Sequence, residues 1–181
     1  MTEYRRIYDL MLSLSAELKQ AGISHALIGG MALGPRGFPR GTIDVDFLIF
    51  EESVQALRGL MRRRGAEPIV EGEEFSSYAD SDVRVDFQHA RREISRSMLE
   101  RAQPVAFPDA DIPVVQAEDL IGLKVQAYHN NPARLQDRVD IQRLIEANWG
   151  KLDFERVHRY FALFRREKDY DDILRIVAAS R

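Results

Sequence analysis

The sequence of 181 residues contains no cysteine. Disulfide bonds, zinc sites with thiolate ligands and cysteine nucleophiles are therefore excluded. The sequence also lacks any apolar run close to the roughly 20 residues that a membrane-spanning helix needs. Charged side chains follow the first residue too soon for a signal peptide. We therefore expect a cytoplasmic protein that does not bind a membrane.

A strong excess of one charge is absent as well, because 26 lysines and arginines stand against 29 acidic residues. This balance argues against a protein that coats long nucleic acids. Arginines nevertheless form three short clusters, at Arg62 to Arg64, at Arg91 and Arg92, and at Arg165 and Arg166. Most clusters of this kind lie on solvated helix faces. The alternative is that these arginines bind one end of an RNA molecule.

The hydrophobic pattern divides the chain into a mixed part and a helical part. In the mixed part we predict helices at 3–21, 52–65 and 93–102, strands at 25–28, 42–50, 66–71 and 82–90, and two short strands around a turn at 108–111. Beyond Gln116 we predict helices at 117–129, 133–147, 153–166 and 168–179. The predicted fold is α+β. Residues 1–116 form a small mixed β-sheet flanked by helices, and residues 117–181 form a C-terminal helical region packed on this core.

One predicted strand carries two carboxylates, Asp44 and Asp46. Alternation along a strand places both on one face and the apolar residues that begin with Ile43 on the other. Two like charges roughly 7 Å apart on so apolar a strand repel each other and lose hydration unless they share a cation. Magnesium fits, because it prefers oxygen ligands and keeps positions open for water and phosphate. The alternative is an edge strand whose acids face solvent, neutralised by Arg36 or Arg40.

A second strand offers a third acid. In the segment "VRVDFQ" the apolar side chains share one face, so Asp86 points to the opposite face. If this strand pairs beside the first, Asp86 joins Asp44 and Asp46 around the metal ions. Asp82 has the same parity, but it lies at the start of the strand, where a role in a turn is favoured.

A glycine pair follows the strand predicted at 25–28. Without side chains, Gly29 and Gly30 let the backbone approach a ligand closely, and successive N–H groups at a helix start form an anion-binding cup. Thirteen residues separate Gly30 from Asp44, enough for a short helix and a loop. Many such glycine pairs are simple turns, which is the alternative.

The helical part holds charged residues in apolar stripes. Lys124 lies one helical turn from Leu120, so its ammonium group needs a partner or must reach water along its aliphatic stem. Asp137 falls in line with Ile141, and Asp140 lies at the margin of the same stripe. These charged residues could lie in apolar stripes because Lys124 contacts Asp137, or because both face a nucleotide.

Four segments together resemble a known family. "LIGGMAL", "RGTIDVDFLI" and "VRVDFQ" resemble the nucleotidyltransferase fold of the DNA polymerase β superfamily, in which a Gly-Gly or Gly-Ser pair precedes Asp-x-Asp and a later strand acid. "IPVVQAEDLIGLKVQAYHNNPARLQDRVDIQRLI" resembles a segment of AbiEii/AbiGii toxin-like nucleotidyltransferases, with a helix lysine and a following Asp-x-x-Asp helix.

The resemblance implies roles for the acids and the glycine pair. Asp44 and Asp46 would hold two Mg²⁺ ions, and Asp86 would complete the metal site that activates the attacking hydroxyl. Gly29 and Gly30 would cradle the β- and γ-phosphates of a nucleoside triphosphate. Many relatives have serine at the second position of the pair, so one hydroxyl contact to phosphate is missing here.

The resemblance also implies roles for four other residues. Arg40 and Thr42 match the arginine and threonine that often precede the acids, near the phosphates. Lys124 would be a catalytic residue that adds positive charge at the reacting phosphate, and Asp137 would bind the nucleotide. The resemblance does not specify which nucleoside triphosphate is used, and ATP is one candidate.

The leading hypothesis is magnesium-dependent transfer of a nucleoside monophosphate from a nucleoside triphosphate to an acceptor hydroxyl. The resemblance implies tRNA, a protein side chain or a small molecule as the acceptor, and a toxin-like protein with an antitoxin partner. One alternative is a non-catalytic scaffold of the same fold that binds a nucleotide or a partner protein. A magnesium-dependent phosphohydrolase ranks last, because nothing in the sequence marks a residue that positions water.

Overall fold

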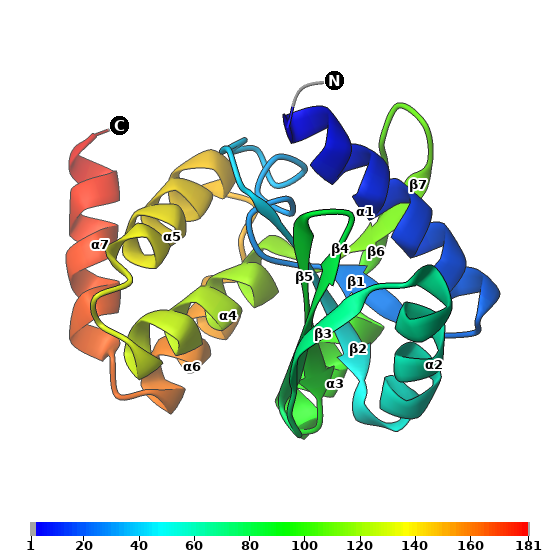
Figure 1. The fold of residues 1–181 in the computed structure, drawn as a ribbon. Helices are drawn as coiled ribbons and strands as arrows, with labels where there is room; N and C mark the ends of the chain where they lie inside the picture. The colour runs from blue at the N-terminus through cyan, green and yellow to red at the C-terminus, as the bar shows by residue number, and fades with distance from the viewer. Residues whose placement is uncertain (1–2, 181) are drawn as a thin grey trace. The chain divides into compact units, whose positions relative to one another are not determined.

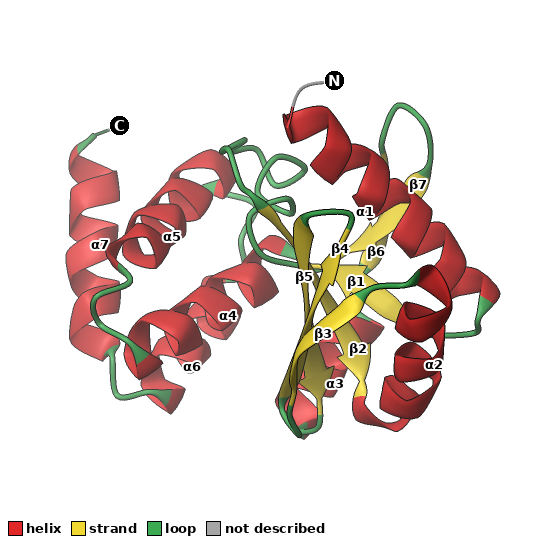
Figure 2. Cartoon of the chain, viewed as in Figure 1, coloured by secondary structure: helices red, strands yellow, loops and turns green. Residues whose placement is uncertain are grey.

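The computed structural model describes residues 3–180 of the chain. The chain divides into two compact units. The first contains the chain up to Pro35 and Pro39–Val115, and the second contains Arg36–Phe38 and the chain from Gln116 onward. The first unit holds all the strands, and the second is helical (Figures 1 and 2).

The first unit is built on one mixed sheet of seven strands, in the order β3-β4-β5-β2-β1-β7-β6. The strands are β1 (His25–Leu27), β2 (Asp44–Phe50), β3 (Glu67–Glu71), β4 (Phe75–Asp80), β5 (Val83–Ala90), β6 (Gln103–Ala106) and β7 (Asp111–Val114). β2 is parallel to β5 and β1 is parallel to β7, while the other neighbours are antiparallel. The predicted α+β class with a mixed sheet is confirmed.

Three α-helices and one short 3-10 helix accompany the sheet in the first unit. They are α1 (Glu3–Gln20), η1 (Glu51–Ser53), α2 (Val54–Arg64) and α3 (Glu93–Glu100). α1 buries Met11, Leu14 and Leu18 completely, as their helical spacing predicts. α2 ends at Gly65, which adopts the left-handed backbone conformation typical of helix ends.

Three details of the first unit differ from the sequence prediction. The strand β4 was not predicted, because its buried Ser76 and Ser77 break the apolar alternation that marks a strand. Residues 29–37 form turns, so the predicted short helix after the glycine pair is wrong. Ile43 precedes β2 and is 75% exposed, so its predicted place on the apolar face of the strand is also wrong.

A tight hairpin joins β4 to β5. Its two central residues, Ser81 and Asp82, both have positive φ, which matches the twist of two-residue hairpin turns. Asp82 therefore lies in a turn, outside the strand that carries Asp86.

The second unit contains four helices, α4 (Ala117–Asn130), α5 (Leu135–Asn148), α6 (Phe154–Leu163) and α7 (Glu167–Ala179). All four predicted helices are confirmed, with ends that differ by up to three residues. Their core includes Ile121, Leu144 and Phe161. None of the helices that the structure describes has the length and apolar character required to span a membrane. Packing of the helical region on the sheet stays a prediction.

Candidate active site

The three predicted acids lie on neighbouring strands. β2 lies between β5 and β1 in the sheet (Figure 1). Its register with β5 pairs Asp46 with Asp86. One carboxylate oxygen from each of Asp44, Asp46 and Asp86 lies within 4.8 Å of the others, and all three residues are half-buried. The alternative that the acids lie on an edge strand is therefore wrong.

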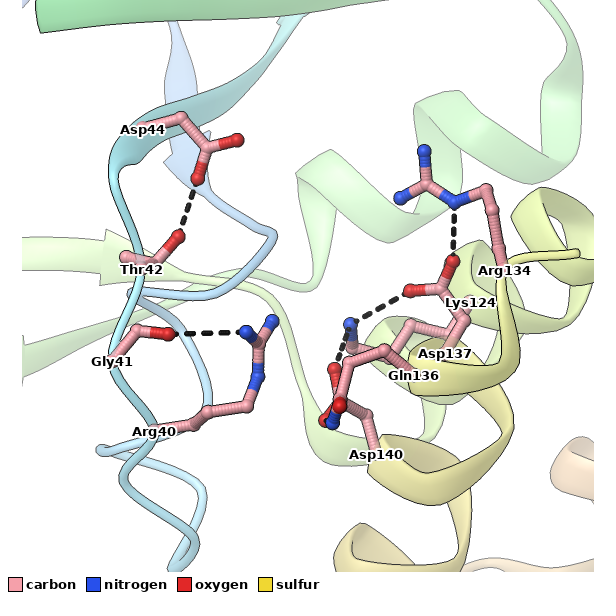
Figure 3. A network of polar contacts seen from close by, with 9 residues as sticks. All are labelled: Arg40, Gly41, Thr42, Asp44, Lys124, Arg134, Gln136, Asp137 and Asp140. Carbon is pink, nitrogen blue, oxygen red and sulfur yellow. Dashed lines mark hydrogen bonds and ion pairs between the residues drawn. The ribbon is translucent and has the colours of Figure 1, made fainter.

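Hydrogen bonds hold two of these carboxylates. The Thr42 hydroxyl donates to Oδ1 of Asp44 (Figure 3). On β5, Nε of Arg84 donates to Oδ1 of Asp86 over 2.8 Å. The hydrogen bond to Asp86, followed by the negative charges of Asp86, Asp44 and Asp46, raises the pKa of Arg84. Arg84 is therefore a cation that the acid cluster attracts, although its side chain is 53% exposed.

The donor set fits a divalent cation of the magnesium type. All three potential ligands are carboxylate oxygens, which are hard ligands that Mg²⁺ prefers. Carboxylates at this separation repel each other, and an exposed arginine offsets little of that repulsion. The arrangement is consistent with divalent metal binding by Asp44, Asp46 and Asp86, while the number of ions stays a prediction.

The glycine pair lies directly against the acid-bearing strand. A Cβ atom on Gly29 would lie 1.9 Å from Oδ2 of Asp46, and one on Gly30 would lie 2.6 Å from Oγ1 of Thr42. Gly29 also has φ of +62°, a conformation that favours glycine. The backbone of the glycine pair therefore approaches Asp46 and Thr42 closely, in a turn instead of at a helix start. Its contact with a phosphate stays a prediction. A serine at position 30 would displace Thr42.

Substitution of Gly29 by alanine should have two effects, one on the stability of the protein and one on the position of the Asp46 carboxylate. The positive φ should cost about 1–2 kcal/mol of stability, and the new methyl group should push the Asp46 carboxylate away from its partners. We expect nucleotidyl transfer to fall by about 100-fold, as for other displacements of about 1 Å. Chemical denaturation and a transfer assay with labelled nucleotide would measure the two effects.

Gly65→Ala is the matched control, because Gly65 has φ of +74° and no atom within 4 Å of an added Cβ. It should show only the loss of stability that the positive φ causes, with unchanged transfer. Equal loss of transfer in both variants would contradict the role of Gly29 in positioning Asp46.

The structure adds Ser77 to the face that carries the acids. Ser77 on β4 is paired with Asp86, which is paired in turn with Asp46 on β2. The side chain is fully buried, and its hydroxyl has no hydrogen-bond partner within residues 3–180. Sequence reasoning missed Ser77 because it missed β4. The only available signal was the Ser-Asp turn before an alternating strand, which can indicate a hairpin.

Arg84 should compete with a divalent ion for Asp86. We expect Arg84→Gln to tighten Mg²⁺ binding by up to about fivefold, since exposed ion pairs are worth about 0.2–1 kcal/mol. Isothermal titration calorimetry with Mg²⁺ would measure the affinity. Arg92→Gln is the control, because Arg92 is 75% exposed and pairs loosely with Glu74 at 3.6 Å. Equal or weaker binding by the Arg84 variant would contradict this competition.

The second unit contains a buried ionic network centred on Lys124. Its Nζ donates to Oδ2 of Asp140 over 2.7 Å and to Oδ1 of Asp137 over 3.2 Å. Arg134 donates to the other oxygen of Asp137, and Gln136 donates to Oδ1 of Asp140 (Figure 3). Lys124 is 5% exposed, so the alternative that its ammonium group reaches water is wrong. The catalytic role predicted for Lys124 and the nucleotide contact predicted for Asp137 stay predictions.

The mixed sheet, the acid-bearing strands and the adjoining glycine pair form the framework within which the family match can be interpreted. Residues 9–179 match the family described as "Nucleotidyl transferase AbiEii toxin, Type IV TA system", and the chain belongs to this family. The resemblance noted in the sequence is thereby confirmed. Among proteins with curated functions, no match was found.

Solved structures support the same fold. The antibiotic-resistance factor ANT(2'')-Ia in solution has a TM-score of 0.70 at 14% identity, covering 94% of this chain and 97% of its own. A crystal structure of ANT(2'')-Ia in complex with adenylyl-2''-tobramycin has a TM-score of 0.67 at 17% identity, covering 91% and 98%. The lincomycin-bound lincosamide antibiotic adenylyltransferase LnuA has a TM-score of 0.53 at 15% identity, covering 78% and 94%.

Proposed function

We propose that this protein is a magnesium-dependent nucleotidyltransferase that moves a nucleoside monophosphate from a nucleoside triphosphate to an acceptor hydroxyl. The observation that carries the proposal is the convergence of the Asp44, Asp46 and Asp86 oxygens within 4.8 Å. Membership of a nucleotidyltransferase family supports the reaction class.

The three acids would hold two Mg²⁺ ions, which when bound would supply positive charge for the phosphates and the developing negative charge. The acceptor oxygen forms a bond to the α-phosphorus, and the bond from that phosphorus to the β-phosphate oxygen breaks. Pyrophosphate carries away the electron pair of the broken bond, and the hydroxyl proton passes to a carboxylate of the cluster, for which we assign Asp86. Asp44 is oriented for its task by the Thr42 hydroxyl.

The phosphates would lie against the turn that starts at Gly29. Backbone N–H groups of Gly29 and Gly30 would bind the β- and γ-phosphates, because glycine lets the backbone approach an anion closely. Arg40 would add positive charge there. Its Nη1 donates to the Gly41 carbonyl over 3.0 Å (Figure 3), so the guanidinium is held on the segment that leads into β2. A phosphate contact by Thr42 would require its hydroxyl to leave Asp44.

The proposal also covers the identity of the acceptor molecule and of a protein partner. The family description names a toxin of a type IV toxin–antitoxin system, which supports a toxin that modifies tRNA or a protein and has an antitoxin partner. The adenylyl-2''-tobramycin bound to ANT(2'')-Ia supports a small-molecule hydroxyl as the rival acceptor.

A labelling experiment tests the proposal. The purified protein is incubated with each α-³²P-labelled nucleoside triphosphate, Mg²⁺ and total cellular RNA, and then with cell protein or aminoglycosides in place of RNA. We expect label in one acceptor class and none when EDTA removes the metal. Nucleotide binding without transfer to any acceptor would contradict the proposal and favour a scaffold.

A further inference from the structure

The hydroxyl of Ser77 on β4 is a buried polar group without its usual partner. The side chain is 0% exposed, and its oxygen forms no hydrogen bond to any of the residues that the structure describes. Burial of a hydroxyl without a hydrogen bond costs free energy, so almost all buried hydroxyls in native proteins have a partner. This exception indicates an acceptor that becomes available in a second state of the protein.

The strand pairing leaves one side-chain acceptor directly opposite this hydroxyl. Opposite residues of an antiparallel pair point to the same side of the sheet, with Cβ atoms about 4.5–5.5 Å apart. The two residues opposite Ser77 are Val70 on β3 and Asp86 on β5, and β4 lies between these strands (Figure 1). The side chain of Val70 is apolar. The acceptor is therefore the carboxylate of Asp86.

In the structure the Asp86 carboxylate is held by Arg84 instead. Nε of Arg84 donates to Oδ1 of Asp86 over 2.8 Å, and the arginine side chain is 53% exposed. A divalent cation bound to the acid cluster would repel this guanidinium, because both are positive and both approach the same carboxylate. The exposed arginine can move into water, and Asp86 then loses its donor. The neutral Ser77 hydroxyl is not repelled by a cation and can replace it.

We infer that Ser77 is a positioning residue that donates a hydrogen bond to Asp86 when a divalent cation occupies the acid cluster. One carboxylate oxygen of Asp86 then faces the cation, and the other accepts from Ser77. Carboxylates that bind metal ions are commonly held by such hydrogen bonds, whose loss typically weakens metal binding by about 10- to 100-fold. The inference rests on the metal site of the proposed function. It assigns Ser77 no contact with the nucleotide, the acceptor or the ion itself.

Ser77→Ala tests the inference through Mg²⁺ binding and thermal unfolding of the full chain. We expect Mg²⁺ to bind about tenfold more weakly or worse, as for the loss of other hydrogen bonds to ligating carboxylates. The metal-free variant should melt at or above the temperature of the wild type, because the substitution removes an unsatisfied buried hydroxyl. Mg²⁺ should raise its melting temperature less than that of the wild type. Isothermal titration calorimetry and thermal unfolding would measure these effects.

Ser76→Ala is the matched control. Ser76 is the preceding residue of β4, is 1% exposed and is paired with Phe87, so it lies on the opposite face of the sheet. Its hydroxyl is hydrogen-bonded to Nε2 of His89 at 3.1 Å. Loss of this bond should lower the melting temperature of the metal-free protein and leave the Mg²⁺ affinity unchanged. The two serine variants should therefore show opposite patterns.

The outcomes separate this inference from the proposed transfer reaction. Equal Mg²⁺ affinity of Ser77→Ala and the wild type, or an equal loss in Ser76→Ala, would overturn the role of Ser77 and leave the transferase proposal intact. A metal-free Ser77→Ala protein that melts well below the wild type would also overturn it, because the hydroxyl would then be satisfied without a cation. Weaker Mg²⁺ binding by Ser77→Ala, in a protein that transfers no nucleotide, would support the role of Ser77 and contradict the transfer reaction. Absence of Mg²⁺ binding by the wild type would overturn the metal site and this inference together.

Discussion

Asp46→Asn is expected to lower magnesium-dependent nucleotidyl transfer by at least about 100-fold, the usual cost of removing a group that stabilises transition-state charge. Asparagine keeps the size of the side chain beside Gly29 but removes the negative charge that would hold a cation. Asp44→Asn should have the same effect. The measurement is the initial rate of label transfer from the α-phosphate at saturating Mg²⁺.

Thermal unfolding gives this prediction a readout besides activity. Without metal, Asp46→Asn should be more stable than the wild type, because one of three mutually repelling carboxylates is neutralised. Mg²⁺ should raise the melting temperature of the wild type, since a ligand that binds only the folded state stabilises it. The same ion should hardly affect the variant.

Asp82→Asn is the matched control for the acid variants. Asp82 lies in the turn before β5 with φ of +65°, a conformation that asparagine also tolerates. Transfer and the effect of Mg²⁺ should both be unchanged. Full transfer activity of Asp46→Asn, or an equal loss of transfer activity in Asp82→Asn, would contradict the metal-binding role of the acid cluster.

The second large effect is expected on stability, from Lys124→Met. The substitution leaves Asp137 and Asp140 buried without their shared cation, and breaking a buried ion pair in this way costs about 3–5 kcal/mol. Trp149 is the single tryptophan of the chain, and its ring packs 5.1 Å from that of Phe154 in the second unit. Urea unfolding followed by tryptophan fluorescence therefore reports on this unit.

Lys168→Met is the control, because Lys168 lies on the exposed surface of α7. It should change the free energy of unfolding by less than about 0.5 kcal/mol. The double variant Lys124→Met with Asp140→Leu should be less destabilised than the sum of its two single variants, since removal of both charges relieves the uncompensated one. Additive effects would show that the two side chains do not interact.

Some features of the candidate site could be predicted from local patterns alone. The two-residue period of a strand places Asp44 and Asp46 on the same face whatever the strand pairs with. The helical period similarly placed Lys124 and Asp137 in apolar stripes, and both are buried in the structure. A charge in such a stripe needs a partner, so the sequence alone predicts a partner for the Lys124 ammonium group.

Other features depend on contacts between segments that lie far apart in the sequence. Asp140, placed at the margin of its stripe, is fully buried and forms the shorter bond to Lys124. β4 has no clear alternation of its own, and its buried Ser77 becomes visible only once the strand is paired with β5. Arg84 is ordinary in the sequence, and only its place beside Asp86 gives it a role.

The sequence by itself determined most of the helices and strands, the faces on which the acids and the lysine lie, and the family, because these depend on short periods and motifs within single segments. Tertiary structure decided which segments meet. The parallel pairing of β2 with β5 brought Asp86 to Asp46, and the fold of the 29–37 turn pressed Gly29 against the same carboxylate. Both depend on the choice of strand neighbours across tens of residues, which is set by the packing of the whole sheet and not by any local pattern.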